Sequence, residues 1–242
     1  MTTAISETSP STRGRILAGL YLSVIICGII AQAAIADRLV VSNDGGETAA
    51  NILGNKSLYR LGYTLFMVEM VAQIAVSAMF YDLLKPVNRS LARITAIIGI
   101  TGAGIKTLAR LFYYTPLILL SGAPYLSAIE PTPLAALSLA FIKINTQAAA
   151  IALVFFGFET LFRGWLIFRS EFLPRFLGVL SMVGGVGWLT YLWPPLGSQV
   201  FVGVALFAIV GVIATCGWLF IRGVDDAKWR ERAALAATSI WR

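Results

Sequence analysis

The sequence predicts an all-α membrane protein: a polytopic bundle of six transmembrane helices with both termini in the cytoplasm. Hydrophobic residues make up 58% of the 242 residues, and the mean hydropathy is +0.80. Charged residues make up only 13%, against about 25% in soluble domains. One bilayer crossing takes about 20 apolar residues, so the chain has room for six crossings with short loops. The prediction is one membrane domain, residues 14–223, between two short terminal segments.

The first span follows a polar N-terminal segment. Residues 1–13 are rich in serine and threonine, so we expect them to be disordered. Arg13 and Arg15 then flank the first apolar run, residues 16–35. A basic flank, an apolar run and the small residues around 31–33 also fit a cleavable signal peptide. The apolar run continues past that site, which favours a retained span.

The second and third spans are predicted to form a hairpin. A long loop, residues 37–60, precedes them and carries a short surface helix at 47–58 after an Asn-Asp-Gly-Gly turn. The second span covers residues 61–84 and the third covers 91–115, joined by a tight basic turn. Pro116 is expected to break or kink the third span near its far end.

The second half of the chain supplies three more spans. Residues 134–168 form an apolar helix too long for one crossing at about 1.5 Å per residue. Its first part either projects beyond the hydrocarbon or breaks near Asn145, which makes residues 148–168 the fourth span. The fifth and sixth spans cover residues 176–193 and 200–221. Small residues predict close packing within these last two spans: Ser181 with Gly185, and Gly203 with Gly211.

Lysine and arginine positions predict the orientation. The N-terminal segment, the turns at 85–93 and 169–175 and the C-terminal segment together carry twelve of the nineteen. The opposite side carries Arg38, Lys56 and Arg60. The positive-inside rule therefore places both termini in the cytoplasm, and we expect a bacterial inner-membrane protein.

The C-terminal segment, residues 224–242, is predicted to form a basic amphipathic helix on the cytoplasmic surface. Its apolar side consists of Trp229, Ala233, Ala236 and Ile240. Such a helix lies on the inner leaflet or docks against a partner. The net charge of +7 is explained by helix ends and anionic lipid, so nucleic acid is not an expected partner.

Composition also excludes several kinds of chemistry. Cys27 and Cys216 both lie inside apolar runs, at a spacing that fits neither a disulfide framework nor a metal site. Histidine is absent, which removes the usual haem ligand and the usual general base at neutral pH. The sequence contains no HExxH, GxSxG or GxxxxGK[ST] motif. We therefore expect no metal, no cofactor and no catalytic residues.

Charged residues inside the spans form the candidate site. Lys106 and Arg110 are one turn apart in the third span and share a face. A charge at bilayer depth costs about 2.5–3.5 kcal/mol on insertion scales, so this face should meet protein. Small residues at helical spacing continue the same face: Ala92, Ala96, Gly99 and Ala103. The charged face is therefore predicted to be the packed face.

The hairpin geometry predicts a partner for Lys106. The turn between spans two and three is centred near residues 87–88, and positions equidistant from that centre should meet. Glu69 and Lys106 are such a pair, so we expect an ion pair between them. Gln73 and Ser77 continue the Glu69 face and add hydrogen-bonding capacity.

Glu159, near the middle of the fourth span, has two candidate partners. One is Arg163 on its own helix, and the other is Lys106 across the bundle. Together these side chains form either a polar cavity or proton pathway between spans two, three and four, or a structural network that fixes helix register. The candidate binding or ion-pair centre is Glu69, Gln73, Lys106, Arg110, Glu159 and Arg163.

Several strings resemble a bacterial family of small integral membrane proteins described as domain of unknown function 4386. The strings are RILAGLYL from Arg15, NILGNKSLYRLG from Asn51, LKPVNRSLA from Leu84, VFFG from Val154 and LIFRSEFLPRFLGVL from Leu166. The resemblance covers residues 13–223 and implies a six-helix inner-membrane protein. Relatives commonly continue the FFG string with Leu-His-Cys, whereas this chain has Phe158-Glu159-Thr160. The third span of relatives is mostly apolar and does not resemble one carrying Lys106 and Arg110.

The sequence thus favours a non-enzymatic membrane protein. Its polar centre is predicted to bind a small amphiphile or ion, or the protein assists a membrane partner. One alternative is a small proton-linked secondary transporter that uses Glu159 or Glu69. Another is an accessory or structural subunit of a membrane complex. All of these hypotheses share one expected partner, the lipid bilayer.

Overall fold

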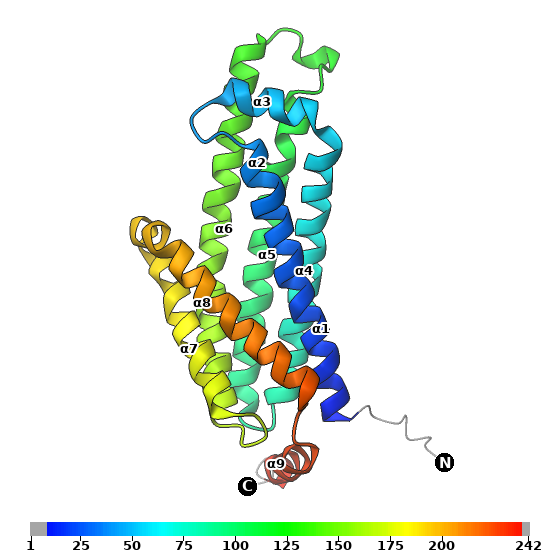
Figure 1. Ribbon diagram of the computed structural model, residues 1–242, viewed down its shortest axis with the longest axis vertical. Helices are drawn as coiled ribbons and strands as arrows, with labels where there is room; N and C mark the ends of the chain where they lie inside the picture. Colours follow the sequence, from blue (N-terminus) through cyan, green and yellow to red (C-terminus); the bar gives the residue numbers. More distant parts are fainter. Residues whose placement is uncertain (1–8, 239–242) are drawn as a thin grey trace, which may run out of the picture. The chain divides into compact units, whose positions relative to one another are not determined.

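The structure is a computed structural model, and it describes residues 9–238. The described residues are helical, with short turns between the helices and no strand (Figure 1). Six of the helical segments are long and apolar enough to cross a membrane, which confirms the predicted fold class: Pro10–Leu39, Lys56–Leu84, Arg89–Leu119, Pro131–Phe168, Arg175–Leu192 and Pro194–Ile221. The protein is therefore a multi-pass membrane protein whose spans contact the lipid bilayer.

Helix α1, Pro10–Ile29, begins earlier than expected. Disorder was expected through residue 13, but Pro10–Arg13 are helical, which corrects that part of the prediction. Proline suits the first helical position, and the Ser9 hydroxyl accepts a hydrogen bond from the Thr12 N–H at 3.2 Å. The rest of the expected disordered segment, residues 1–8, lies outside the described residues.

The first span ends in a wider helical turn. A π-helix, Ile30–Ala36, leads into α2, Asp37–Leu39. Helix α3, Gly45–Gly54, lies in the loop before the second span. It starts two residues before the predicted surface helix, because Asp44 caps it by accepting from the Glu47 N–H at 2.8 Å.

Helices α4, Lys56–Leu84, and α5, Arg89–Leu119, form the predicted hairpin. The Asn88 side chain accepts from the Leu91 N–H at 2.9 Å and so caps α5. Helix α5 continues through Pro116 to Leu119, so the proline does not break it. A proline this close to a helix end removes one hydrogen bond from a turn that is about to terminate.

Helix α6, Pro131–Phe168, is unbroken at Asn145. This outcome leaves projection beyond the hydrocarbon, because 38 residues at 1.5 Å each span about 57 Å. A short 3₁₀ turn, Pro124–Leu126, precedes it.

The last spans are α7, Arg175–Leu189, which continues as a 3₁₀ turn, Thr190–Leu192, and α8, Pro194–Ile221. Helix α8 starts six residues before the predicted sixth span because Pro194 begins it. Helix α9, Asp226–Thr238, follows as the predicted C-terminal helix.

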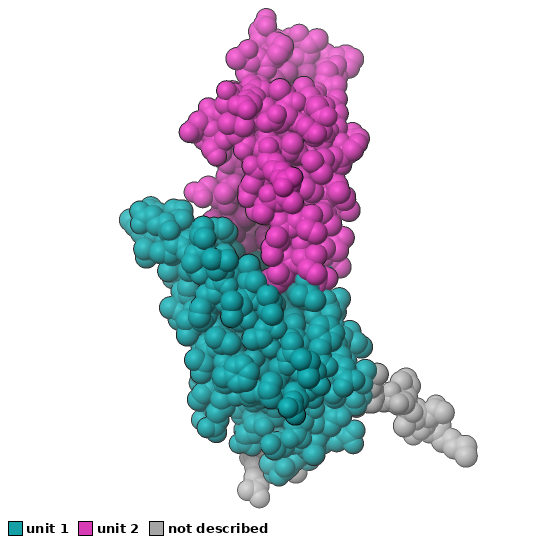
Figure 2. All heavy atoms as spheres, viewed as in Figure 1, with its two compact units in different colours: residues 1–22, 72–101, 153–242 teal, residues 23–71, 102–152 magenta. Residues whose placement is uncertain are grey.

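The chain divides into two compact units (Figure 2). Unit 1 consists of Met1–Leu22, Ala72–Thr101 and Leu153–Arg242, and unit 2 consists of Ser23–Val71 and Gly102–Ala152. Helices α1, α4, α5 and α6 each contribute residues to both units. Unit 1 also contains α7, α8 and α9, whereas unit 2 contains α3.

Within unit 1, α6 and α7 pack with their backbones in close contact. A Cβ on Gly164 would lie 2.7 Å from the Gly178 carbonyl oxygen, and one on Gly185 would lie 2.8 Å from the Gly157 carbonyl oxygen. Real Cβ atoms do not approach backbone this closely, and a Cβ on Gly178 would also lie 2.6 Å from the Gly164 carbonyl oxygen, so Gly164, Gly178 and Gly185 require glycine. The predicted packing role of Gly203 is wrong, since a Cβ there would meet nothing within 4 Å.

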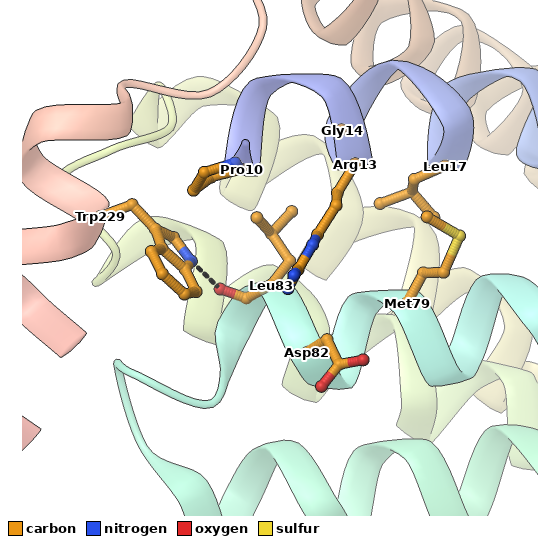
Figure 3. Close-up of a pocket in the computed structure, with 8 residues that line it drawn as sticks. All are labelled: Pro10, Arg13, Gly14, Leu17, Met79, Asp82, Leu83 and Trp229. Atoms are coloured by element: carbon orange, nitrogen blue, oxygen red, sulfur yellow. Dashed lines mark hydrogen bonds between the residues drawn. The ribbon is translucent and has the colours of Figure 1, made fainter. Parts of the chain in front are cut away.

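Helix α9 packs on unit 1 through Trp229. Its indole N–H donates to the Leu83 carbonyl at 2.8 Å, and Trp229 closes a small pocket with Leu83 and Arg13 (Figure 3). Trp229, Ala233 and Ala236 are half-buried at helical spacing, so the predicted apolar side exists. At Trp229 this side contacts the protein itself, rather than the leaflet as expected. Ile240 lies outside the described residues.

The start of α9 is fixed by two aspartates. Asp225 accepts from the Lys228 N–H at 3.1 Å, and this backbone hydrogen bond holds the pKa of the Asp225 carboxyl below its usual value. Asp226 accepts from the Ser11 N–H at 2.7 Å. The Asp226 contact joins the C-terminal helix of unit 1 to the beginning of α1.

Candidate functional site

The charged face of α5 is buried, as the sequence predicts. Ala92 and Ala103 are 1% and 0% exposed, and Arg110 is 2% exposed. Small side chains let neighbouring helices approach this face, which removes its charges from lipid. The polar contacts along it fall into two groups, one within each unit.

In unit 2, Glu69 and Lys106 form the predicted ion pair. Lys106 Nζ lies 2.6 Å from Glu69 Oε1, and the two side chains are 17% and 7% exposed, respectively. Gly28 in α1 adjoins the carboxylate, because a Cβ there would lie 3.1 Å from Glu69 Oε1. The hairpin thus brings opposite charges together inside the spans, and the glycine leaves room for them.

Arg110 is the second cation of this group, and it has no carboxylate partner. Within the described chain it makes no ion pair, and its NH1 donates to Asn145 Oδ1 at 3.0 Å. Its guanidinium lies 3.6 Å from the centre of the Phe66 ring, a close cation–π contact. Asn145, which lies in α6, therefore binds Arg110 of α5 and does not break its own helix.

An aromatic group borders Arg110. Tyr59 and Tyr113 stack with ring centres 4.3 Å apart, and the Tyr59 hydroxyl donates to the Tyr113 carbonyl at 2.5 Å. Phe66 meets the Tyr113 ring edge to face at 5.3 Å. Gly62 allows this arrangement, since a Cβ there would lie 2.8 Å from the Tyr113 hydroxyl.

Unit 2 contains polar atoms that protein contacts do not satisfy. Within the described residues, three buried side-chain atoms lack a hydrogen-bond partner: Glu69 Oε2, Arg110 Nε and the Tyr113 hydroxyl. Leaving a buried donor or acceptor unpaired costs about 1–3 kcal/mol, so such atoms usually have a ligand or water. One acceptor, one charged donor and one hydroxyl therefore remain available in the unit 2 group.

In unit 1, Glu159 pairs with Arg163 on its own helix, which settles the choice left open by the sequence. Arg163 NH1 lies 3.0 Å from Glu159 Oε1, and both residues are 2% exposed. Ser77 donates to the same oxygen at 3.2 Å, and Gln73 donates to Glu159 Oε2 at 3.4 Å. The carboxylate is therefore enclosed by donors from α4 and α6.

Arg163 is enclosed as completely as its partner. Its NH2 donates to the Tyr21 hydroxyl at 2.8 Å and to the Thr160 hydroxyl at 3.3 Å. Its guanidinium also lies 4.6 Å from the centre of the Phe80 ring. No unsatisfied buried atom of the described chain belongs to either member of the pair. The unit 1 group is thus electrically neutral and saturated.

The six predicted site residues are all in polar contacts, but not in one set. Glu69, Lys106 and Arg110 belong to unit 2, as the list of its segments shows, and Gln73, Glu159 and Arg163 belong to unit 1. Sequence reasoning missed the neutral partners of the arginines, Tyr21, Phe66 and Phe80. Their signal is an aromatic residue inside a span opposite an arginine, which one sequence cannot assign to a particular arginine.

Two comparisons extend this description. An uncharacterised protein of the archaeon Archaeoglobus fulgidus is 24% identical over 166 residues, which cover 66% of this chain and 81% of the relative. No solved structure matches the chain. The sequence profile of the family described as domain of unknown function DUF4386 matches residues 16–223, from the first span to the end of the sixth. The chain therefore belongs to the DUF4386 family.

Proposed function

We propose that the unit 2 centre, defined as Glu69, Lys106, Arg110, Tyr113 and Asn145, binds the acidic head of a small amphiphile. The observation that carries the proposal is the set of unsatisfied buried atoms beside an unpaired cation. The centre holds two cations and one carboxylate, a surplus of one positive charge. A carboxylate or phosphate oxygen would supply the missing negative charge and would accept from the two unsatisfied donors, Arg110 Nε and the Tyr113 hydroxyl.

Each residue has a distinct role in this proposal. Lys106 is the accessible cation, with a side chain 17% exposed, and Glu69 holds it in place. Arg110 is anchored by Asn145 and Phe66, so its free Nε is presented without further ordering of the side chain. The Tyr113 hydroxyl accepts or donates at the edge of the centre. An apolar tail suits a ligand that arrives through the membrane-spanning region.

The unit 1 group has a different role in the proposal. Glu159 and Arg163 neutralise each other, and their hydrogen bonds are filled by protein. A ligand could bind to this pair only by displacing hydrogen bonds that protein groups already make. The pair instead fixes the register of α4 against α6. We assign this group to structure.

Decanoate titration of the purified full-length protein tests the proposal. We expect decanoate to raise the thermal unfolding midpoint of the wild type in a saturable way, since it binds only the folded state. Arg110→Gln should weaken the apparent affinity by about tenfold or more, because a charge-assisted hydrogen bond contributes about 1.5–3 kcal/mol. Lys143→Gln is the matched control, because Lys143 is an exposed cation of unit 2.

A second variant separates binding from folding. Glu69→Gln/Lys106→Met removes both members of the ion pair, so no buried charge is left alone. We expect this protein to assemble with decanoate binding weakened. If Arg110→Gln and Lys143→Gln respond to decanoate like the wild type, the centre does not bind acidic amphiphiles and the unit 2 pair is structural.

A proton-linked transporter is the second candidate function, and one observation favours Glu69 over Glu159 as its carboxylate. Glu69 Oε2 has no partner, whereas both oxygens of Glu159 accept hydrogen bonds. Proteoliposomes with an internal pH dye distinguish the two functions. Protonated decanoic acid crosses lipid unaided, so protein-free liposomes set the baseline rate of lumen acidification. Acidification faster than this baseline, returned to it by Glu69→Gln, supports transport, whereas decanoate binding with acidification at the baseline rate supports a binding protein.

The charge distribution supports the cytoplasmic membrane of a bacterium as the location. Twelve of the nineteen basic residues lie on the side that carries both termini. The proposal therefore places the N-terminal segment and α9 in the cytoplasm.

A further inference from the structure

A pocket of about 520 Å³ lies in unit 1 between the turn that joins α6 to α7 and one side of α9. Five charged side chains line it: Glu171, Arg175, Lys228, Glu231 and Arg232. The pocket is separate from both groups of intramembrane charges, because it shares no residue with either. Its lining carries three cations and two carboxylates.

The wall formed by the α6–α7 turn is rigid. Phe172 and Leu173 are 3% and 5% exposed, and the buried Ser170 hydroxyl accepts from the Leu173 N–H at 3.3 Å. Glu171 lies between these anchors at φ 60°, a left-handed conformation that costs a residue with a side chain about 1 kcal/mol or more. The Asp225 N–H donates to the Phe172 carbonyl at 3.3 Å, which ties α9 to the turn. This backbone hydrogen bond joins the two walls of the pocket.

The charged side chains that line the described pocket form no ion pair with one another. Among the described residues, Glu171, Arg175, Glu231 and Arg232 make no ion pair within 4.0 Å. Lys228 alone has a carboxylate partner, Asp225 at 3.4 Å, and both side chains are largely exposed. Such exposed pairs contribute about 0–1 kcal/mol and exchange readily. Both signs of charge therefore remain available to a ligand.

The pocket lies at the membrane surface. Helix α6 ends at Phe168 and α7 begins at Arg175, so the turn between them marks the end of two spans. Helix α8 returns to the same side after one crossing and ends at Ile221, just before α9. Lipid phosphates and ammonium groups are found at this level of a bilayer.

We propose that this pocket binds a phospholipid headgroup that carries both a phosphate and a primary ammonium, the chemistry of phosphoethanolamine. Arg175, Lys228 and Arg232 bind the phosphate, and Glu171 and Glu231 accept hydrogen bonds from the ammonium. A purely anionic headgroup would face two uncompensated carboxylates. Choline has a quaternary nitrogen with no N–H to donate.

Native mass spectrometry of the full-length protein in detergent, titrated with defined lipids, tests the proposal. We expect phosphatidylethanolamine to bind roughly two- to fivefold more tightly than phosphatidylglycerol or phosphatidylcholine, the range that partly exposed charge pairs provide. Arg232→Gln should weaken phosphatidylethanolamine binding by a similar factor. Arg230→Gln, which changes an exposed α9 arginine that does not line the pocket, should leave it unchanged.

The carboxylates give the sharper measurement. Glu171→Gln/Glu231→Gln should abolish the preference for phosphatidylethanolamine over phosphatidylglycerol while both lipids still bind. Equal effects of the two arginine variants would mean that only general surface charge attracts lipid, and this overturns the proposal. Preferential binding of phosphatidylglycerol by the wild type also overturns it, as does full displacement of lipid by equimolar soluble phosphoethanolamine, which would make the ligand a free solute.

Discussion

At the scale of single residues, Gly99 shows how little space surrounds the buried charges of unit 1. A Cβ at this position would lie 2.6 Å from the Ser77 hydroxyl and 2.7 Å from Glu159 Cδ. Neither side chain can retreat easily, because they hydrogen-bond each other and Arg163 pairs with the carboxylate. A methyl group is therefore enough to disturb the saturated network.

We expect Gly99→Ala to lower the free energy of unfolding by about 1–3 kcal/mol, the usual cost of overpacking. Gly104→Ala on the same helix should be neutral or slightly stabilising, because its Cβ would meet nothing within 4 Å and alanine favours helix. Unfolding of each purified protein in mixed micelles, followed by tryptophan fluorescence, provides the measurement. Equal destabilisation by the two substitutions would contradict the close contact at Gly99.

The buried pair of unit 1 leads to a second prediction. Arg163→Gln leaves Glu159 buried without its cation, so we expect a loss of about 3–5 kcal/mol in the free energy of unfolding. Glu159→Gln/Arg163→Gln should recover part of that loss. Lys85→Gln breaks an exposed pair with Asp82 and should cost less than about 1 kcal/mol. A double variant as unstable as Arg163→Gln alone would contradict a mutual charge interaction.

Residue contacts were predictable where chain geometry alone determines them. Glu69 and Lys106 are equidistant from the turn of one hairpin, so counting residues was enough to pair them. Tyr21 and Asn145 could not be assigned to their arginines in this way. Tyr21 lies on α1, far from Arg163 in sequence, and Asn145 is separated from Arg110 by the irregular segment between α5 and α6, so counting residues does not pair them. The rotation of these helices is set by packing that no local spacing reports.

At the scale of elements, glycines on both helices form the close α6–α7 contact. Gly157 faces Gly185 and Gly164 faces Gly178, and each pair is centred on residue 171 in the connecting turn. The two glycines of each helix are seven residues apart, two turns of a helix, so both fall on one stripe. The sequence contained this signal, because the stripes match when the helices are folded back on each other.

Gly164→Ala should therefore open the α6–α7 contact. Its Cβ would lie 2.7 Å from the Met182 backbone nitrogen as well as from the Gly178 carbonyl, and backbone cannot rotate away. We expect a loss of about 1–3 kcal/mol in the free energy of unfolding. Gly203→Ala in α8 is the control with no neighbour within 4 Å. Comparable unfolding midpoints for the two variants in a detergent series would contradict the close glycine contact between α6 and α7.

Element boundaries were predicted less well than element number. Hydropathy identified all six spans, but α5 and α8 both extend beyond the apolar runs that define them. Hydropathy reports only the part of a helix that matches hydrocarbon, whereas capping residues decide where the helix starts. Pro194 is such a residue, and so is the Ser9–Pro10 pair that begins α1.

At the scale of the whole molecule, the charge asymmetry predicts the orientation. Ala227→Cys in α9 should react with a membrane-impermeant maleimide only after cells are permeabilised, and Ser127→Cys should react in intact cells. Both positions are exposed. The unsubstituted protein is the control, because Cys27 and Cys216 lie inside spans. Labelling of Ala227→Cys in intact cells would contradict the predicted orientation and indicate the opposite one.

The sharing of α1, α4, α5 and α6 between the units has a consequence for dissection of the protein. The divisions between units fall after Leu22, Val71, Thr101 and Ala152, and each of these lies in the interior of a helix. A fragment that contains either unit alone would consist of helices cut in their interiors. Cut helix ends inside a membrane leave backbone groups without hydrogen-bond partners. Neither unit can therefore be produced as an autonomous fragment, so mutational work has to use the whole membrane domain.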